Sequence, residues 1–341
     1  MTATAAILGC CGPKLTAEER AFFRRVKPWG FILFGRNVTN PDQVRALVDA
    51  LRDTVGRADA PVLIDQEGGR VQRLGPPNWG RYPPGRAYGD LAGHDPLLRR
   101  EITRLGARLM AHDLKALGIN VDCAPVLDVP DPAGHEIIGD RAYGRTPDEV
   151  ALLGRAAAEG LIAGGVLPVI KHIPGHGRAM ADSHLELPVV DASLEDLEAR
   201  DFAPFRVLSD MPIAMTAHVI FAAIDRKRPA TASKKVIRRI VRGAIGFDGL
   251  VMSDDLSMKA LSGGFTERAE AARAAGCDVV LHCNGDMAEM KAVAAGAGAL
   301  KGRAAERAAA ALARVARTPE PFDAGEARAR FDAAFEGRFA A

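Results

Sequence analysis

The sequence has 341 residues, 48% of them hydrophobic and 26% charged, which is ordinary for a soluble globular protein and excludes a disordered or fibrous chain. Its 45 Lys and Arg residues nearly balance its 43 Asp and Glu residues, and the formal net charge of +2 indicates neither a nucleic acid nor an anionic membrane as a partner. The five Cys residues are odd in number and lack paired CxxC spacing, so neither a disulfide framework nor a zinc ribbon is indicated and a reducing compartment is favoured.

The start of the chain, residues 1–12, is apolar but has no basic leader, and it is too short for a membrane-spanning helix or a usual signal peptide. No later apolar run reaches about 18 residues, the approximate threshold for a membrane span. We therefore expect a cytoplasmic protein.

Eight short apolar runs, each bounded by turn residues, are predicted to be buried β-strands. They cover residues 5–9, 30–34, 61–65, 119–123, 166–170, 212–217, 249–253 and 277–282. The segments between them have helical periodicity, and Thr16, Asn40, Thr146 and Ser193 stand where helices are predicted to begin, each followed by acidic residues or Pro. This alternation, without a long linker or a shift in composition, predicts one (β/α)8 barrel domain over residues 1–341. The Ala- and Arg-rich residues 285–341 are predicted to form the last barrel helix and a C-terminal helical extension.

Polar or ionisable residues follow six of the eight predicted strands. They are Asp65 to Arg73, Asp122 and Asp128, Lys171 and His172, Thr216 and His218, Asp254 and Asp255, and His282 and Asn284. A lone Asp after a strand is usually a cap or turn residue. Six such ends on one rim of a barrel instead indicate a site, because burying that many polar groups without partners is costly.

The densest cluster of these residues follows the fifth strand, where Lys171-His172-Ile173-Pro174-Gly175-His176-Gly177 leads into Asp182-Ser183-His184. A carboxylate two residues before an imidazole can orient it and raise its basicity, so Asp182 and His184 are candidates for delivering a proton from a loop that could close over substrate. His176, between two Gly residues, is interpreted as stabilising the loop.

A group that captures or stabilises a cation-like sugar carbon is the natural partner of such a proton donor. Asp254 is the best candidate because it follows an apolar strand directly, whereas Asp255 is better suited to cap the next helix. Lys171, His172, Arg73 and Arg141 are donors suited to holding hydroxyl groups.

These motifs, together with Asp65-Gln66-Glu67-Gly68-Gly69-Arg70-Val71-Gln72-Arg73 and Ser253-Asp254-Asp255-Leu256, resemble glycoside hydrolase family 3, and more closely its bacterial cytoplasmic β-N-acetylglucosaminidases of peptidoglycan recycling. The resemblance covers roughly residues 5–290. It implies a (β/α)8 barrel and retaining cleavage through a covalent glycosyl-enzyme. One departure is Ile173, where the family usually has Phe, and we expect this exchange to alter packing rather than chemistry.

The resemblance also implies the roles of single residues. Asp254 is the expected nucleophile, His184 the general acid/base and Asp182 its dyad partner. The expected substrate-binding residues are Asp65, Arg73, Arg141, Lys171 and His172. The implied substrate is a muropeptide in which N-acetylglucosamine is joined to 1,6-anhydro-N-acetylmuramic acid. We expect a monomer that uses no cofactor and no metal.

Three other functions remain open from the sequence. A neutral or cationic acid/base could admit phosphate as the acceptor, which would make the enzyme a phosphorylase. A metal-dependent hydrolase would use His172, His176, Asp182 and His184, but their spacing matches no helical or hairpin metal motif. A non-catalytic sugar-binding barrel would have no need for both a nucleophile and a proton donor.

Overall fold

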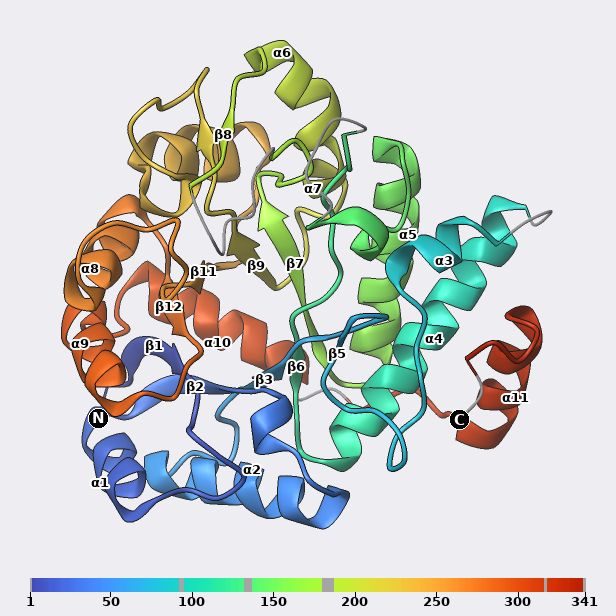
Figure 1. Ribbon diagram of the computed structural model, residues 1–341, viewed down its shortest axis with the longest axis horizontal. Helices are drawn as coiled ribbons and strands as arrows, with labels where there is room; N and C mark the ends of the chain where they lie inside the picture. The colour runs from blue at the N-terminus through green and yellow to red at the C-terminus, as the bar shows by residue number, and fades with distance from the viewer. Residues whose placement is uncertain (1, 92–94, 132–136, 180–186, 316–317, 340–341) are drawn as a thin grey trace.

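The computed structural model describes residues 2–91, 95–131, 137–179, 187–315 and 318–339, and it contains one closed barrel of eight parallel strands (Figure 1). In order around the barrel these are β1 (Thr4–Leu8), β12 (Val279–His282), β11 (Leu250–Asp255), β9 (Ile213–Thr216), β7 (Leu167–Ile173), β6 (Val121–Asp122), β3 (Val62–Ile64) and β2 (Pro28–Leu33). Each overlaps a run predicted to be a strand, so the barrel is confirmed. Strands β7 and β11 continue past their predicted ends into the polar residues that follow.

The pleat of the strands divides their side chains between two cores. Successive residues of a strand point to opposite faces, so Leu250 and Met252 of β11 fill the barrel interior, whereas Val251 between them packs under the helices. Two residues beyond Met252, the same alternation brings Asp254 to the inside of the barrel mouth. On β7 the same alternation brings Lys171 to the inside of the barrel mouth. The strands therefore place these polar groups directly above the apolar interior.

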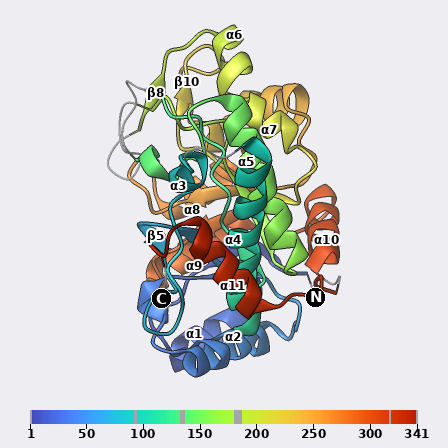
Figure 2. The ribbon, with the colours of Figure 1, turned by 90° about the vertical axis from the view of Figure 1, so that its right-hand side faces the viewer.

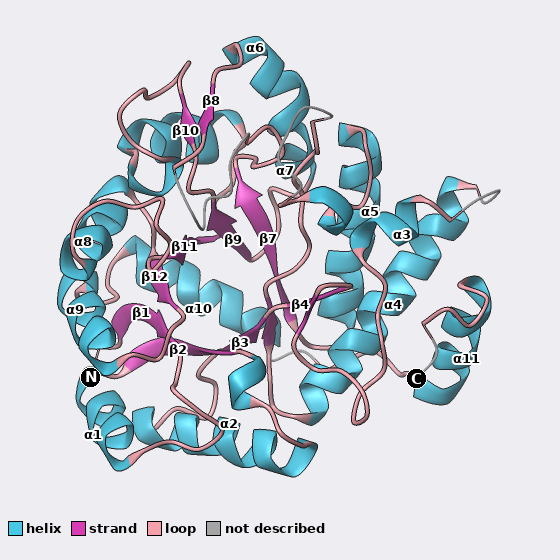
Figure 3. Cartoon of the chain, viewed as in Figure 1, coloured by secondary structure: helices cyan, strands magenta, loops and turns pink. Residues whose placement is uncertain are grey.

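Helices surround the barrel (Figure 3). They are α1 (Ala17–Val26), α2 (Pro41–Val55), α3 (Gly85–Gly89), α4 (Pro96–Ala116), α5 (Pro147–Ala163), α6 (Leu194–Asp196), α7 (Ala203–Val207), α8 (Phe265–Ala275), α9 (Met287–Ala297), α10 (Arg303–Val315) and α11 (Ala324–Ala334). Three short 3-10 helices, η1 (Gly35–Asn37), η2 (Gly139–Arg141) and η4 (Ala230–Ala232), and two π-helices, η3 (Leu197–Asp201) and η5 (Val236–Ala244), complete the helical segments of the described residues. The predicted helix starts are confirmed at Thr16, Asn40, Thr146 and Ser193, because each side chain accepts a hydrogen bond from the amide three residues later.

The predicted C-terminal helical extension is formed by α10 and α11. Ala308 and Ala311 of α10 pack with the barrel's interior core, so this helix covers the end of the barrel where the strands begin. Helix α11 packs on α4 and is the red helix beside it in Figure 2. Its Phe331 and Phe335 lie against Tyr88, which precedes α4 in the chain.

Two small sheets, not predicted from the sequence, stand outside the barrel. The hairpin of β4 (Gln66–Gly68) and β5 (Val71–Gln72) follows β3 directly. A parallel pair, β8 (Val189–Val190) and β10 (Ile220–Phe221), joins the segments that follow β7 and β9. Among the described residues, no helix has both the length and the apolar character needed to cross a bilayer.

Candidate active site

A cavity of about 490 Å³ opens at the carboxyl ends of the barrel strands. Ile32, Met215 and Leu281 of the interior core contribute to its lining. Six of the predicted site residues also line it, namely Asp65, Arg73, Arg141, Lys171, His172 and Asp254. The other two, Asp182 and His184, lie outside the described residues.

Asp254 stands near the end of β11, and its Oδ1 accepts a hydrogen bond of 2.8 Å from the Asp255 amide. Burial alone would raise the pKa of this carboxyl group. Its electrostatic interactions with His218 and His172, followed by the amide hydrogen bond, outweigh burial and hold the pKa of Asp254 below its ordinary value. Asp254 is therefore ionised at neutral pH, as a carboxylate nucleophile must be.

A network of buried ion pairs forms one wall of the cavity. Lys171 Nζ lies 3.0 Å from Asp65 Oδ1 and 2.7 Å from Glu67 Oε1, and only 3% of the Lys171 side chain is exposed. Arg141 donates two parallel hydrogen bonds of 2.8 Å to the Glu67 carboxylate, and Arg73 Nη2 lies 3.4 Å from Asp65 Oδ2. Burial opposes ionisation of Glu67, but the charges of Lys171 and Arg141 hold its pKa well below the usual range.

Glu67 was not singled out from the sequence, although it lies between two predicted binding residues. The β4–β5 hairpin turns its carboxylate back into the cavity. A hairpin that starts directly after a barrel strand was not predicted. The Gly68-Gly69 pair was the signal in the sequence that could have indicated it, because both residues adopt the positive φ that tight hairpin turns require.

His172 is oriented by Asp128, whose Oδ2 lies 2.7 Å from His172 Nδ1. Asp128 is fully buried, and although burial raises its pKa, His172 more than offsets this and keeps the pKa low. An ionised carboxylate can only accept, so Nδ1 carries the proton of this contact. Asp128 Oδ1 also accepts from the His176 amide at 2.7 Å, which fixes the turn after β7.

His176 is also part of the cavity lining, and its ring lies 5.7 Å from the ring of His172. Burial lowers the pKa of His176 to about 4, and it is therefore neutral near pH 7. Ile173, the departure from the family pattern, is fully buried in the outer core, which agrees with a packing role.

Two expectations about strand ends were wrong. Asp255 does not cap the next helix, because α8 begins at Phe265 after Gly264; its carboxylate instead accepts from the amides of Ser257 and Cys283. Asp122 does not line the cavity either. It is fully buried and accepts a hydrogen bond from the Gln66 amide, so it fixes the start of the hairpin.

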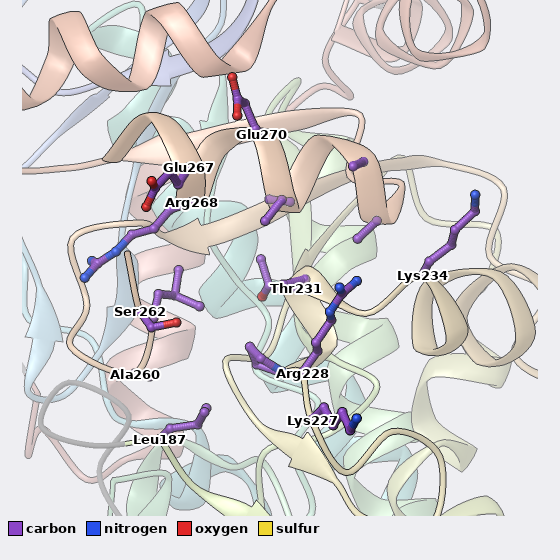
Figure 4. Close-up of a pocket in the computed structure, with 17 residues that line it drawn as sticks. Leu187, Lys227, Arg228, Thr231, Lys234, Ala260, Ser262, Glu267, Arg268 and Glu270 are labelled. Atoms are coloured by element: carbon purple, nitrogen blue, oxygen red, sulfur yellow. The ribbon is translucent and has the colours of Figure 1, made fainter. Parts of the chain in front are cut away.

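A second hollow of about 680 Å³ lies between α8 and residues 227–234 (Figure 4). Lys227, Arg228 and Lys234 lie on one side of it and Glu270 on the other, with small Ala side chains of α8 between them. No predicted site residue lines this hollow, so the predicted chemistry belongs to the cavity at the barrel mouth. Among the described residues, no three or more His, Cys, Asp and Glu side chains form a group that could hold a metal ion.

The sequence profile of the glycosyl hydrolase family 3 N-terminal domain matches residues 6–318. The chain belongs to glycosyl hydrolase family 3. A β-hexosaminidase of Methylococcus capsulatus is 44% identical to it over 277 residues, which are 80% of either chain. A β-hexosaminidase of Pseudomonas aeruginosa is 41% identical over 276 residues, again 80% of either chain.

Solved structures give the same family 3 assignment. The structure of NagZ from Neisseria gonorrhoeae in complex with N-trifluoroacetyl-D-glucosamine superposes with a TM-score of 0.81 at 32% identity, covering 98% of both chains. A family 3 β-N-acetylglucosaminidase from Paenibacillus gives a TM-score of 0.86 at 33% identity, over 98% of this chain and 67% of that one. The protein is therefore a glycoside hydrolase of the β-hexosaminidase class.

Proposed function

We propose that this family 3 enzyme is a retaining exo-β-N-acetylglucosaminidase that removes the non-reducing terminal N-acetylglucosamine from peptidoglycan-derived muropeptides. The proposed substrate is N-acetylglucosamine joined to 1,6-anhydro-N-acetylmuramic acid. The observation that carries the proposal is Asp254, an ionised carboxylate near the end of a barrel strand, in a cavity that is also lined by the donors Arg73, Arg141, Lys171 and His172. The similarity to β-hexosaminidases supports the choice of sugar.

In the first step an oxygen of Asp254 attacks the anomeric carbon, and the bond from that carbon to the leaving oxygen breaks. His184, held by Asp182, gives its proton to the leaving oxygen. In the second step the neutral His184 takes a proton from water, which attacks the anomeric carbon and frees Asp254. Two displacements at one carbon keep the configuration of the sugar. A histidine suits both tasks because its unperturbed pKa is about 6.5.

The proposed substrate-binding residues are Asp65, Arg73, Arg141, Lys171 and His172. Four of them are donors, and each is already fixed by a carboxylate before substrate arrives. Such preorganised donors lose little conformational freedom on binding a sugar. The carboxylate of Asp65, held by Lys171 and Arg73, accepts hydrogen bonds from sugar hydroxyl groups.

We also propose that the enzyme is cytoplasmic, because the proposed muropeptide is met inside the cell. We further propose that it is a monomer and that it uses no cofactor. Light scattering after size-exclusion chromatography measures the oligomeric state directly. A mass of about twice 36.2 kDa would contradict the monomer.

The deciding experiment compares turnover of an aryl β-N-acetylglucosaminide with the matching aryl β-glucoside, with and without phosphate. We expect release from the N-acetyl substrate only, no sugar 1-phosphate, and loss of activity in Asp254→Ala. Sugar 1-phosphate among the products would make the enzyme a phosphorylase. Activity on neither substrate would contradict the glycosidase, and full activity of Asp254→Ala would remove this residue as the nucleophile.

A further inference from the structure

His218 has no role in the proposed mechanism, yet it contacts the residue that follows the proposed nucleophile. It follows β9 and is fully buried. Its Nε2 is 3.0 Å from the carbonyl oxygen of Asp255, the residue after Asp254. A carbonyl oxygen only accepts hydrogen bonds, so Nε2 carries a proton.

The other ring nitrogen of His218 faces a hydroxyl group. Nδ1 lies 2.7 Å from Thr231 Oγ1, which is also 3.1 Å from the carbonyl oxygen of Ala217 and 2.7 Å from Thr216 Oγ1. When His218 is neutral, Thr231 donates to Nδ1. When His218 is protonated, Nδ1 donates to Thr231, and Thr231 donates to Ala217. Rotation of one hydroxyl group therefore satisfies both forms of the imidazole.

The backbone of Asp255 connects this arrangement to the nucleophile. Its carbonyl oxygen accepts from His218, and its amide donates to Asp254 Oδ1 at 2.8 Å. The carboxylate of Asp255 is held by the amides of Ser257 and Cys283. The carbonyl and the amide of Asp255 flank one Cα atom, so His218 anchors the same residue whose amide fixes the nucleophile.

We propose that His218 is a positioning residue for Asp254, and that Thr231 maintains its contact with Asp255 in both protonation states. This inference rests on the proposed role of Asp254 as the nucleophile. His218 acts through the Asp255 backbone and through its charge, and it does not contact the reacting atoms.

The charged groups around His218 determine how pH affects it. Asp254 and Asp255 on β11 favour its protonated form, and His172 on β7 opposes it. Burial is the largest influence and lowers the pKa of His218, so the ring is neutral near pH 7. In its protonated form, His218 favours the ionised form of Asp254 and so lowers the pKa of that carboxyl group. Removing the imidazole therefore raises the pKa of Asp254.

The test uses His218→Asn and Thr231→Val, with Thr103→Val as the matched control. Thr103 is equally buried but donates to the carbonyl oxygen of Arg99 within α4. The readouts are kcat, KM and the pH profile of kcat/KM on the aryl N-acetylglucosaminide. For His218→Asn we expect kcat to fall about 100-fold, the scale of loss when a catalytic group is misplaced. KM changes little, and the acidic limb of kcat/KM moves to higher pH.

Thr231→Val is expected to shift the acidic limb in the same direction by less, while Thr103→Val leaves it in place. A merely structural role would lower the amount of folded enzyme without moving the limb. The inference would be overturned if His218→Asn and Thr231→Val both fold, keep the wild-type kcat and leave the acidic limb of kcat/KM in place. If His218→Asn does not fold, the result for Thr231→Val alone decides. Asp254→Ala is assayed in parallel to separate the proposed nucleophile from the proposed positioning residue. If Asp254→Ala is active, the role of Asp254 as nucleophile is contradicted. If Asp254→Ala is inactive while the His218 and Thr231 variants behave as wild type, only the positioning role of His218 is contradicted.

Discussion

The carboxylate of Glu67 holds Lys171 and Arg141 together in the cavity wall, so its charge serves both stability and binding. Glu67→Gln leaves two buried cations without a full countercharge, and we expect it to destabilise the fold by about 3 kcal/mol and to weaken kcat/KM. Urea denaturation and steady-state kinetics measure the two effects. The control is Glu306→Gln, because Glu306 pairs with Arg303 at the surface, with both side chains 64% exposed, and its loss should change neither quantity.

The effect of Glu67→Gln also depends on pH. The pKa of Glu67 in the folded protein lies below its value in the unfolded chain. Its stabilising contribution is therefore complete above the unfolded pKa of about 4.3 and is lost as the pH falls toward the folded pKa. We expect the stability difference between wild type and Glu67→Gln to shrink below about pH 4. A constant difference down to pH 2 would show that packing rather than charge is responsible.

The pH profile of catalysis follows from two residues with opposite requirements. In the proposed mechanism Asp254 must be ionised, and because its pKa lies below the ordinary value it stays ionised through the neutral and mildly acidic range. His184 must be protonated for the first step, so kcat/KM should fall as the pH rises through its pKa, about 6.5 if unperturbed. His184→Ala should lose far more rate on substrates with poor leaving groups than on activated ones. Equal losses on both would remove His184 from the acid role.

Which residues line the cavity was predictable from the sequence where a strand end displayed them or a recognisable motif contained them. Asp254 and Lys171 follow apolar runs whose alternation continues into the cavity, and both were identified. Glu67 and Asp128 were missed as site residues because each acts through a partner far away in the chain, Arg141 and His172 respectively. Pairings of this kind depend on how loops fold over the rim, and no local pattern encodes them.

Helix α11 supports the active site from a distance. Its Phe331 lies 6.1 Å from Tyr82 between ring centroids. The Tyr82 backbone accepts from the Gly69 amide and donates to the Gln72 side chain, so this contact holds the hairpin that carries Glu67. We expect Phe331→Ala to cost about 3–5 kcal/mol and also to raise KM.

The matched control for Phe331→Ala is Phe247→Ala, which removes an equally buried ring just before β11 begins. It should destabilise the protein by a similar amount without changing KM. Equal changes in KM for both variants would indicate a general loss of stability rather than a specific link from α11 to the hairpin. The helical character of residues 285–341 was predictable from composition, but this link was not, because it joins residues far apart in sequence.

For the whole molecule, the architecture was predictable because eight buried strands alternating with helices have few compact solutions. The small β8–β10 sheet was missed because its strands have two residues each and pair across a long stretch of chain.

A ligand that binds only the folded barrel stabilises the protein against unfolding. N-acetylglucosamine at about 100 times its Kd should stabilise the fold by about 2.7 kcal/mol, measured as a rise in Tm. Glucose at the same concentration should give no rise, and an equal effect of both sugars would contradict recognition of the N-acetyl group.

The packed interior of the barrel also determines the route by which products leave. Below the cavity the barrel is filled by apolar side chains, and α10 covers its far end. In the proposed mechanism, a sugar bound to Asp254 therefore departs through the same mouth by which the leaving fragment has already gone. N-acetylglucosamine is the last product and meets the free enzyme, so it should inhibit competitively against substrate.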